Sequence, residues 1–189
     1  MIGDKIAKFE SGAKGTAAIS TGAGDPGGVS YGKYQLASKT GTLQSFLKQS
    51  GYDSVFHGLT PGTQPFNDKW LSLAHNQSFK EAENQFIVDT HYKPVEDHAS
   101  QLGIPVDNDM IKEALFSMSV QHSGANSIVD KAVRSLQGRD NLTDKDVLKA
   151  LYSARSNYVS NLKTLSAPIK ASILNRYRDE EELLIEGLT

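Results

Sequence analysis

Glycine is concentrated near the start of this chain, between residues 11 and 30, and this limits what the first part of the chain can form. Six glycines occur there, at positions 12, 15, 22, 24, 27 and 28, and Pro26 is the one stiff residue among them. Glycine disfavours helices, and no apolar periodicity runs through the segment. We therefore expect a loop here, with short elements on either side of it.

The segments that flank this loop predict different elements. An apolar helical pattern before it predicts a short helix from Asp4 to about Glu10, which ends at Gly12. After it, residues 29–36 suit a short hairpin with a bend at Gly32. Further helices are predicted for the ranges 40–49, 67–75, 78–92, 109–122, 125–136, 143–165 and 168–187. We expect one domain over residues 1–189 that is mainly α (α+β), with a small β-hairpin lobe.

Two carboxylates stand apart in this opening region, because Glu10 and Asp25 are the only acidic residues between Lys5 and Asp53. Hydrolysis of a glycosidic bond uses one acid to protonate the leaving oxygen and a second carboxylate to activate water or attack. Apolar neighbours at a helix end favour a protonated Glu10, whereas a polar loop leaves Asp25 hydrated. The alternative is structural: Glu10 is a solvated residue near a helix end, and Asp25 caps its own Asp-Pro-Gly-Gly turn.

Sequence motifs around these acids resemble a known family. They are KFESG at 8–12, GDPGGVSYGKYQL at 24–36, KTGTLQSFL at 39–47, FIVDTHY at 86–92 and FSMSVQHSGA at 116–125. They resemble the peptidoglycan-cleaving domain of some type VI secretion spike proteins and phage lysins. That domain is related to chitosanases and belongs to the lysozyme-like superfamily. The resembling motifs cover about the first two thirds of the chain, and we expect the resemblance to extend over all of it.

The resemblance implies a lysozyme-like, two-lobed helical fold and a muramidase that cleaves β-1,4 bonds of peptidoglycan. It implies Glu10 as general acid and Asp25 as general base, and the chitosanase kinship implies inversion at the anomeric carbon. Within enzymes, the alternatives are a chitosanase and a lytic transglycosylase. The non-enzymatic alternative is a wall-binding or virion structural module that has kept the fold.

Aromatic and polar side chains near these motifs are candidates for contacts with sugar. Tyr31, Tyr34 and Gln35 offer flat apolar faces with a polar rim, although such tyrosines are equally typical of a protein core. Trp70, the only tryptophan, is better explained as a core residue. The resemblance adds four further candidates for the substrate groove: Asp89, Tyr92, Gln121 and His122. Without the resemblance, His122 is more typical of a structural histidine.

Several functional classes are disfavoured by the sequence. The chain has no cysteine, which excludes disulfides, thiolate nucleophiles and cysteine metal sites. The histidine spacing lacks an HExxH motif, and the glycines fit neither a P-loop nor a dinucleotide fingerprint, so we expect no metal and no cofactor. A formal charge of −2 offers no basic field for nucleic acid.

The sequence also bears on delivery. Residues 1–20 lack the apolar core of a signal peptide, and no run of eighteen apolar residues predicts a transmembrane segment. If peptidoglycan is the partner, we expect a protein made in the cytoplasm and carried to the wall or periplasm by a phage or secretion device. We expect a monomer, or one module of a larger delivery protein.

The C-terminal third carries no functional motif.

Helix caps are also predicted from the sequence. Capping boxes are predicted at Ser78 with Glu81 and at Thr143 with Asp146. Residues 107–109 are expected to supply the N-cap of the helix that follows. The arginines and tyrosines at 155, 158 and 176–178 are expected mainly on solvated faces, paired with the acidic run 179–182.

Overall fold

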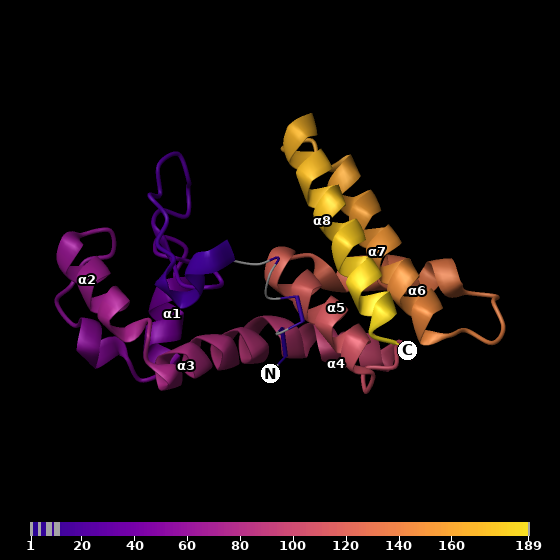
Figure 1. Ribbon diagram of the computed structural model, residues 1–189, viewed down its shortest axis with the longest axis horizontal. Helices are drawn as coiled ribbons and strands as arrows, with labels where there is room; N and C mark the ends of the chain where they lie inside the picture. The colour runs from indigo at the N-terminus through magenta and orange to yellow at the C-terminus, as the bar shows by residue number, and fades with distance from the viewer. Residues whose placement is uncertain (1, 4, 7–8, 10–11, 189) are drawn as a thin grey trace. The chain divides into compact units, whose positions relative to one another are not determined.

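The computed structural model describes residues 2–3, 5–6, 9 and 12–188, and the chain divides into two compact units. The hairpin unit spans Glu10–Thr90, and the helical unit combines Met1–Phe9 with His91–Thr189 (Figure 1). The fold class predicted from the sequence, mainly helical with one small antiparallel hairpin, is confirmed. Among the described residues, no helix combines the length and apolar character needed to cross a lipid bilayer.

The hairpin unit contains a small sheet surrounded by short helices. Its sheet pairs Ser30 with Ala37 and Tyr31 with Leu36 in antiparallel register. Its elements are, in chain order, the 3-10 helix η2 (Gly12–Ala17), β1 (Ser30–Tyr31), β2 (Leu36–Ala37), α1 (Thr42–Gln49), the 3-10 helix η3 (Asp53–Phe56), α2 (Gln64–Leu73) and α3 (Gln77–Ile87).

An aromatic cluster forms the core of the hairpin unit, with Trp70 of α2 at its centre. The Trp70 ring centroid lies 5.2 Å from that of Tyr31, 4.9 Å from Phe79 and 6.0 Å from Phe46. All four side chains are buried. Trp70 also donates its indole N–H to the carbonyl of Thr16 at 2.8 Å. The sequence-based interpretation of Trp70 as a core residue is therefore confirmed.

The helical unit is built around a central buried helix. Its elements are α4 (Lys93–Gln101), α5 (Asp109–Gln121), α6 (Ala125–Leu136), α7 (Asp144–Asn161) and α8 (Ala167–Glu186). Figure 1 shows α7 and α8 running alongside each other, and α5 packs against α4, α7 and α8. The start of the chain belongs to this unit because the Gly3 amide donates to Glu113 of α5 at 2.8 Å.

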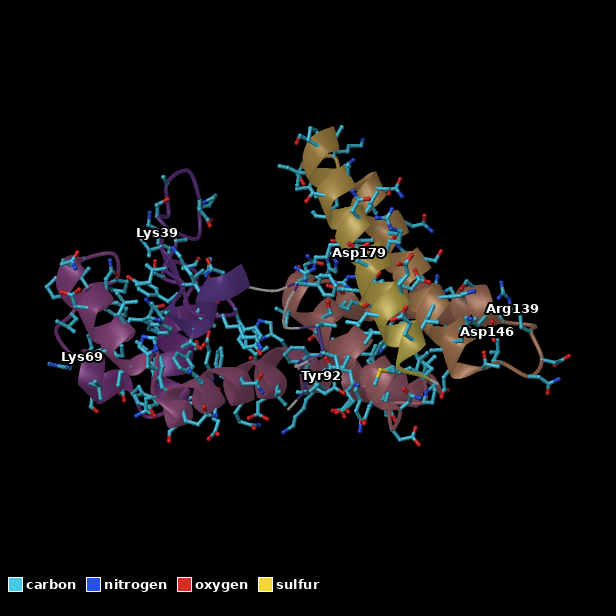
Figure 2. The ribbon with its side chains drawn as sticks, in the orientation of Figure 1. Lys39, Lys69, Tyr92, Arg139, Asp146 and Asp179 are labelled. Atoms are coloured by element: carbon cyan, nitrogen blue, oxygen red, sulfur yellow. The ribbon has the colours of Figure 1, made fainter. Side chains whose placement is uncertain are left out.

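Two of the three predicted caps are confirmed. Asn108 caps α5, accepting from two backbone amides of its first turn. Thr143 and Asp146 form the capping box of α7, near the loop where Arg139 and Asp146 are labelled in Figure 2. The third expectation was wrong, because the N-cap of α3 is Asn76, whose side chain accepts from the amides of Ser78 and Phe79.

Local structure also differs from expectation at three places. The glycine-rich stretch is not loop throughout, since its first residues form η2. In the described part of the expected opening helix, Lys5 and Ile6 form turns, and Phe9 is 3-10 helical, donating its N–H to the Ile6 carbonyl at 2.9 Å. The predicted 78–92 helix continues to Tyr92, but as a π-helical segment, η4 (Val88–Tyr92), after α3.

Candidate functional site

Asp25, the predicted general base, lies exposed on a surface turn of the hairpin unit. Its Oδ1 accepts the backbone N–H of Gly27 at 2.7 Å, and its carbonyl accepts the N–H of Gly28 at 2.9 Å. This geometry is the Asx turn expected for an Asp-Pro-Gly-Gly sequence. The exposed carboxylate therefore organises its own turn while remaining in contact with water.

The loop that carries Asp25 is closed at its base by the hairpin. The Ser20 amide donates to the Ser30 carbonyl at 2.9 Å, and the Ser30 amide donates to Ser20 Oγ at 2.8 Å. Next to this pair, Ile19 forms a bridge with Tyr31. Because both ends of the loop attach to β1, the position of the hairpin determines where the loop begins and ends.

Glu10, the predicted general acid, lies outside the described residues, and so does Ser11. The first described element after it is η2, which begins at Gly12. The sequence motif alone therefore supports a catalytic role for Glu10.

The three hairpin residues predicted to contact sugar occupy different environments. Tyr31 is fully buried; its hydroxyl donates to Asn67 Oδ1 at 2.6 Å and accepts the Gly62 N–H at 2.6 Å. This corrects its expected place in the groove, because a ring enclosed by the aromatic core cannot offer a face to substrate. Tyr34 is half-buried, and Gln35 is exposed at the turn.

Glu83 of α3 is a buried acid that the sequence-based analysis missed. Its side chain is 1% exposed, and its Oε1 accepts the backbone N–H of Tyr34 at 3.2 Å. Burial raises the pKa of Glu83 to about 7. This effect outweighs the hydrogen bonds from the Thr16 hydroxyl and the amides of Tyr34 and Lys33, and the positive charge of Lys33, which all lower the pKa. A signal was available, because Glu83 occupies an apolar-face position of the 78–92 pattern, four residues after Phe79.

Asp89 lines a hollow of about 260 Å³ in the hairpin unit. The Asp89 carboxylate accepts the side-chain N–H of Gln85 at 3.0 Å. The other lining residues come from the last residue and C-cap of α1 and from α3, and are Gln49, Ser50, Ala82, Gln85 and Phe86. Asp89 thus lies at a surface depression with a mixed polar and apolar lining, and its contact with substrate stays a prediction.

The three candidates in the helical unit are more enclosed than expected. Tyr92 is buried; its hydroxyl donates to Glu96 at 2.7 Å and its ring packs against Phe116. His122 is buried at the end of α5, and Gln121 is half-buried beside it. Tyr92 and His122 therefore serve as packing residues in this structure, which corrects the expectation that they face the substrate groove.

Gln121 and His122 belong to a hydrogen-bonded network between α5, α7 and α8. Gln121 Oε1 accepts from the Tyr177 hydroxyl at 2.6 Å and from Arg155 Nη2 at 2.7 Å. His122 Nε2 lies 2.7 Å from the Tyr177 hydroxyl. Burial lowers the pKa of His122 to about 4, and the positive charge of Arg155 adds to this effect. His122 is therefore neutral at pH 7.

Arg155 is the centre of this network, contrary to its expected place on a solvated face. Its side chain has no exposure, and its Nη1 donates to Glu180 Oε2 at 2.9 Å. Glu180 also accepts from Arg176 at 2.6 Å and from the Ser117 hydroxyl at 2.9 Å. An internal ion pair needs such additional bonds to offset the loss of hydration, and here they are present.

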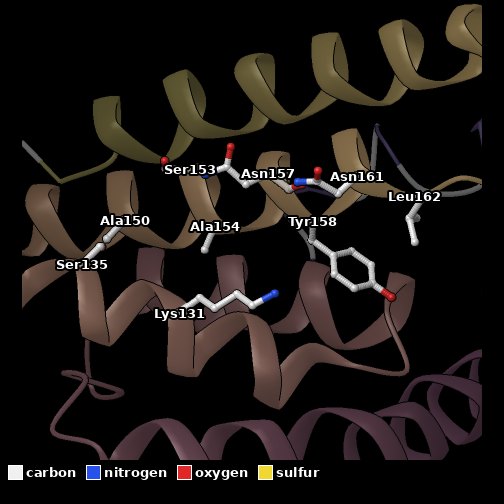
Figure 3. Close-up of a pocket in the computed structure, with 9 residues that line it drawn as sticks. All are labelled: Lys131, Ser135, Ala150, Ser153, Ala154, Asn157, Tyr158, Asn161 and Leu162. Atoms are coloured by element: carbon white, nitrogen blue, oxygen red, sulfur yellow. The ribbon is translucent and has the colours of Figure 1, made fainter.

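A second hollow, of about 300 Å³, lies between α6 and α7 (Figure 3). Ala150 and Ala154 are buried, while Lys131, Asn157 and Asn161 are exposed polar residues of its lining. Tyr158, expected mainly on a solvated face, lines this hollow, and none of the seven residues predicted for the substrate groove does.

Comparison with known proteins relates both units to one family. Residues 2–181 match the family described as type VI secretion system spike protein VgrG3-like, C-terminal. The chain belongs to this family. A curated relative, the type VI secretion system spike protein VgrG3 of Vibrio cholerae serotype O1 (strain ATCC 39315 / El Tor Inaba N16961), is 32% identical over 202 residues.

The match to the VgrG3-like family covers more of the chain than the motifs did. It extends into α8, and so includes the C-terminal third in which no motif was recognised. The alignment covers 99% of this chain and 19% of the Vibrio cholerae protein, so the chain spans about a fifth of the length of that relative. The predicted relationship to type VI secretion spike proteins is confirmed, and the match includes the positions of both predicted acids.

Proposed function

We propose that this domain hydrolyses β-1,4 glycosidic bonds in the glycan strands of peptidoglycan. Glu10 protonates the leaving oxygen, and Asp25 activates the attacking water. The observation that carries the proposal is that both acids, in motifs that resemble a wall-cleaving domain, lie inside the stretch that matches the spike-protein family. A formal charge of −2 offers little electrostatic attraction to the anionic wall, so delivery as part of a spike protein is consistent with the proposal.

The surroundings of Asp25 support its part in this reaction. A general base must be hydrated, must be held at a defined position and must accept a proton from water. Asp25 is exposed, and its bond to the Gly27 N–H fixes one carboxylate oxygen in the turn. Glycines on both sides allow a polymeric substrate to approach this turn closely.

Digestion of purified sacculi tests the proposal. We expect the wild-type domain to release muropeptides with reducing ends, and Glu10→Gln and Asp25→Asn each to remove nearly all release. Matched controls are Glu81→Gln and Asp107→Asn, which change exposed acids of the same types and should keep wild-type activity. Full release by both Glu10→Gln and Asp25→Asn would overturn the proposal.

Mass spectrometry of the products distinguishes the enzymatic alternatives. Anhydro ends in place of reducing ends would identify a lytic transglycosylase, which works with a single acid. Faster turnover of chitosan than of wall material would identify a chitosanase. Proton NMR of the first products reports the stereochemistry, since cleavage of a β bond with inversion yields the α-anomer.

A non-enzymatic role as a wall-binding module is the second candidate. The observation that favours it is the turn geometry, because the bond from the Gly27 N–H to Asp25 gives this carboxylate a structural purpose. Binding of the wild-type domain to sacculi, with no product released, would support this role over hydrolysis.

A further inference from the structure

We propose that Glu83 is a positioning residue that holds the turn of the β-hairpin and thereby fixes the base of the loop that carries Asp25. The inference rests on the proposed function, in which Asp25 is the general base. Glu83 itself is 1% exposed, so it acts through the hairpin rather than by touching the substrate.

Consecutive residues of α3 hold both the backbone and the side chain of Tyr34. Glu83 Oε1 accepts the Tyr34 backbone N–H at 3.2 Å, and Asn84 Oδ1 accepts the Tyr34 hydroxyl at 2.6 Å. Both acceptors are buried, and α3 is a regular helix in which their spacing is fixed. The hairpin turn is thus attached to a rigid element at two points.

Gly32 shows how closely the hairpin approaches Glu83. Its φ of 81° lies in the left-handed region, and a Cβ placed on it would be 2.0 Å from Glu83 Oε1 and 3.0 Å from Trp70 Cζ2. No side chain fits in this gap, so the backbone of the turn rests directly on the carboxyl group. Because the Gly32 backbone lies so close to the Glu83 carboxyl group, the position of the hairpin is sensitive to changes at Glu83.

Hydrogen bonds connect this turn to the Asp25 loop. The Gly32 amide donates to the Ala18 carbonyl at 2.8 Å, and Ile19 bridges to Tyr31. The bonds between Ser20 and Ser30 follow, and they close the loop. All of these residues belong to the hairpin unit, so a displacement of the turn is transmitted to both ends of the loop.

The charge state of Glu83 determines how well it performs this role. Below about pH 7 the carboxyl is neutral and can accept the Tyr34 N–H without placing a charge in the core. Above it, an ionised carboxylate is buried beside the aromatic cluster, which favours hydration and loosening of the turn. The titratable groups of the hairpin are Tyr31, Lys33 and Tyr34, and Lys33 supplies the charge that acts on Glu83. The neighbours from the other elements are Trp70 of α2 and Thr16 of η2, and neither of these side chains titrates in this pH range.

Trp70 fluorescence tests the link between Glu83 and the hairpin without any substrate. Trp70 is the only tryptophan, so its emission reports this core alone. We expect a wild-type transition near pH 7, its loss in Glu83→Gln, and its retention in Glu81→Gln, a control on the exposed face of the same helix. A wild-type transition that persists unchanged in Glu83→Gln would overturn the inference.

Activity measurements test the positioning role itself. We expect kcat of the wild type to fall as the pH rises through about 7, because the carboxyl ionises there. Glu83→Gln keeps the acceptor and cannot ionise. It should lose the fall near pH 7, keep wild-type activity below it, and retain only the alkaline limb set by ionisation of the general acid Glu10. Glu83→Ala should lower kcat at every pH by about tenfold or more, with a smaller change in KM.

The outcomes separate this inference from the proposed function. If kcat falls identically at alkaline pH in the wild type and in Glu83→Gln, the positioning role is contradicted. That result would have no bearing on the proposed hydrolysis. A wild-type protein that is inactive on sacculi would contradict the proposed function, and with it the catalytic positioning role of Glu83. The Trp70 titration would still show whether Glu83 holds the hairpin. If Glu83→Ala does not fold, Glu83→Gln still allows both the Trp70 titration and the measurement of kcat against pH.

Discussion

Arg155 of α7 and Glu180 of α8 form an ion pair with no solvent exposure on either side chain, with Nη1 and Oε2 2.9 Å apart. The pair lies beneath the end of α5, where Ser117 and Gln121 accept from the same guanidinium group. Three helices of the helical unit therefore meet at one arginine, and their arrangement depends on its bonds.

Removing the Arg155 side chain should destabilise the folded protein. Arg155→Met leaves Glu180 buried with less compensation, and we expect a loss of about 3 kcal/mol in the free energy of unfolding. The double variant Arg155→Met with Glu180→Leu should lose less than the single variant, because no uncompensated carboxylate remains. Urea denaturation measures both. The exposed pair of Arg178 and Asp179 is the control, and Arg178→Ala should cost below about 1 kcal/mol. A single variant as stable as the wild type would contradict this account.

His122 should make the protein sensitive to acid. Its pKa is lowered to about 4 in the folded state, from 6.5 in an exposed histidine, so the unfolded chain binds the proton first as the pH falls. The stabilisation is present above pH 6.5 and is lost as the pH falls towards about 4. We expect His122→Asn to remove about 2 kcal/mol of this pH dependence of the free energy of unfolding. This is less than the full pKa difference implies, because solvent screens part of the ring. Denaturation at several pH values measures it; parallel curves would refute the prediction.

Glu83 should have the opposite pH dependence in the hairpin unit. Its folded pKa of about 7 exceeds the ordinary value of 4.5, so the folded state keeps a proton that the unfolded chain releases. Stability of the hairpin unit should therefore fall as the pH rises from about 4.5 to 7. Hydrogen exchange resolved by segment measures this, with intrinsic rates corrected for pH. Protection should rise in α3 and fall at the end of α5 on acidification, and changes of the same sign in both would contradict the assignments.

Gly32 should tolerate a side chain poorly. Gly32→Ala adds a methyl group where Glu83 and Trp70 leave no room, and we expect a loss of about 2 to 4 kcal/mol from strain and overpacking. Gly58→Ala is the matched control, because Gly58 has a similar φ of 76° and a Cβ added to it would meet nothing within 4 Å. The control should lose only about 1 kcal/mol. Equal losses in both variants, by thermal unfolding, would show that the close approach does not matter.

The bounds of α6 and two of the three caps were predictable because their signals are local. The 125–136 helix has the observed bounds of α6, since an apolar stripe and a flanking glycine act within a few residues. The capping box of Thr143 and Asp146 was readable for the same reason. The place of Asp25 in its turn likewise follows from the adjacent Pro26 and Gly27, whatever surrounds them.

Burial was decided by the tertiary structure. Arg155 looked like a surface residue until α8 placed Glu180 against it, and Tyr31 looked like a sugar-binding residue until Trp70 and Phe66 enclosed its ring. The shift of the Glu83 pKa depends on a hairpin turn 49 residues away in sequence. Periodicity in the sequence determined which elements form, because hydrogen bonds and caps within an element are short-range. Only the packing of those elements decided which polar groups lose water, because desolvation depends on neighbours that the chain brings together from distant positions.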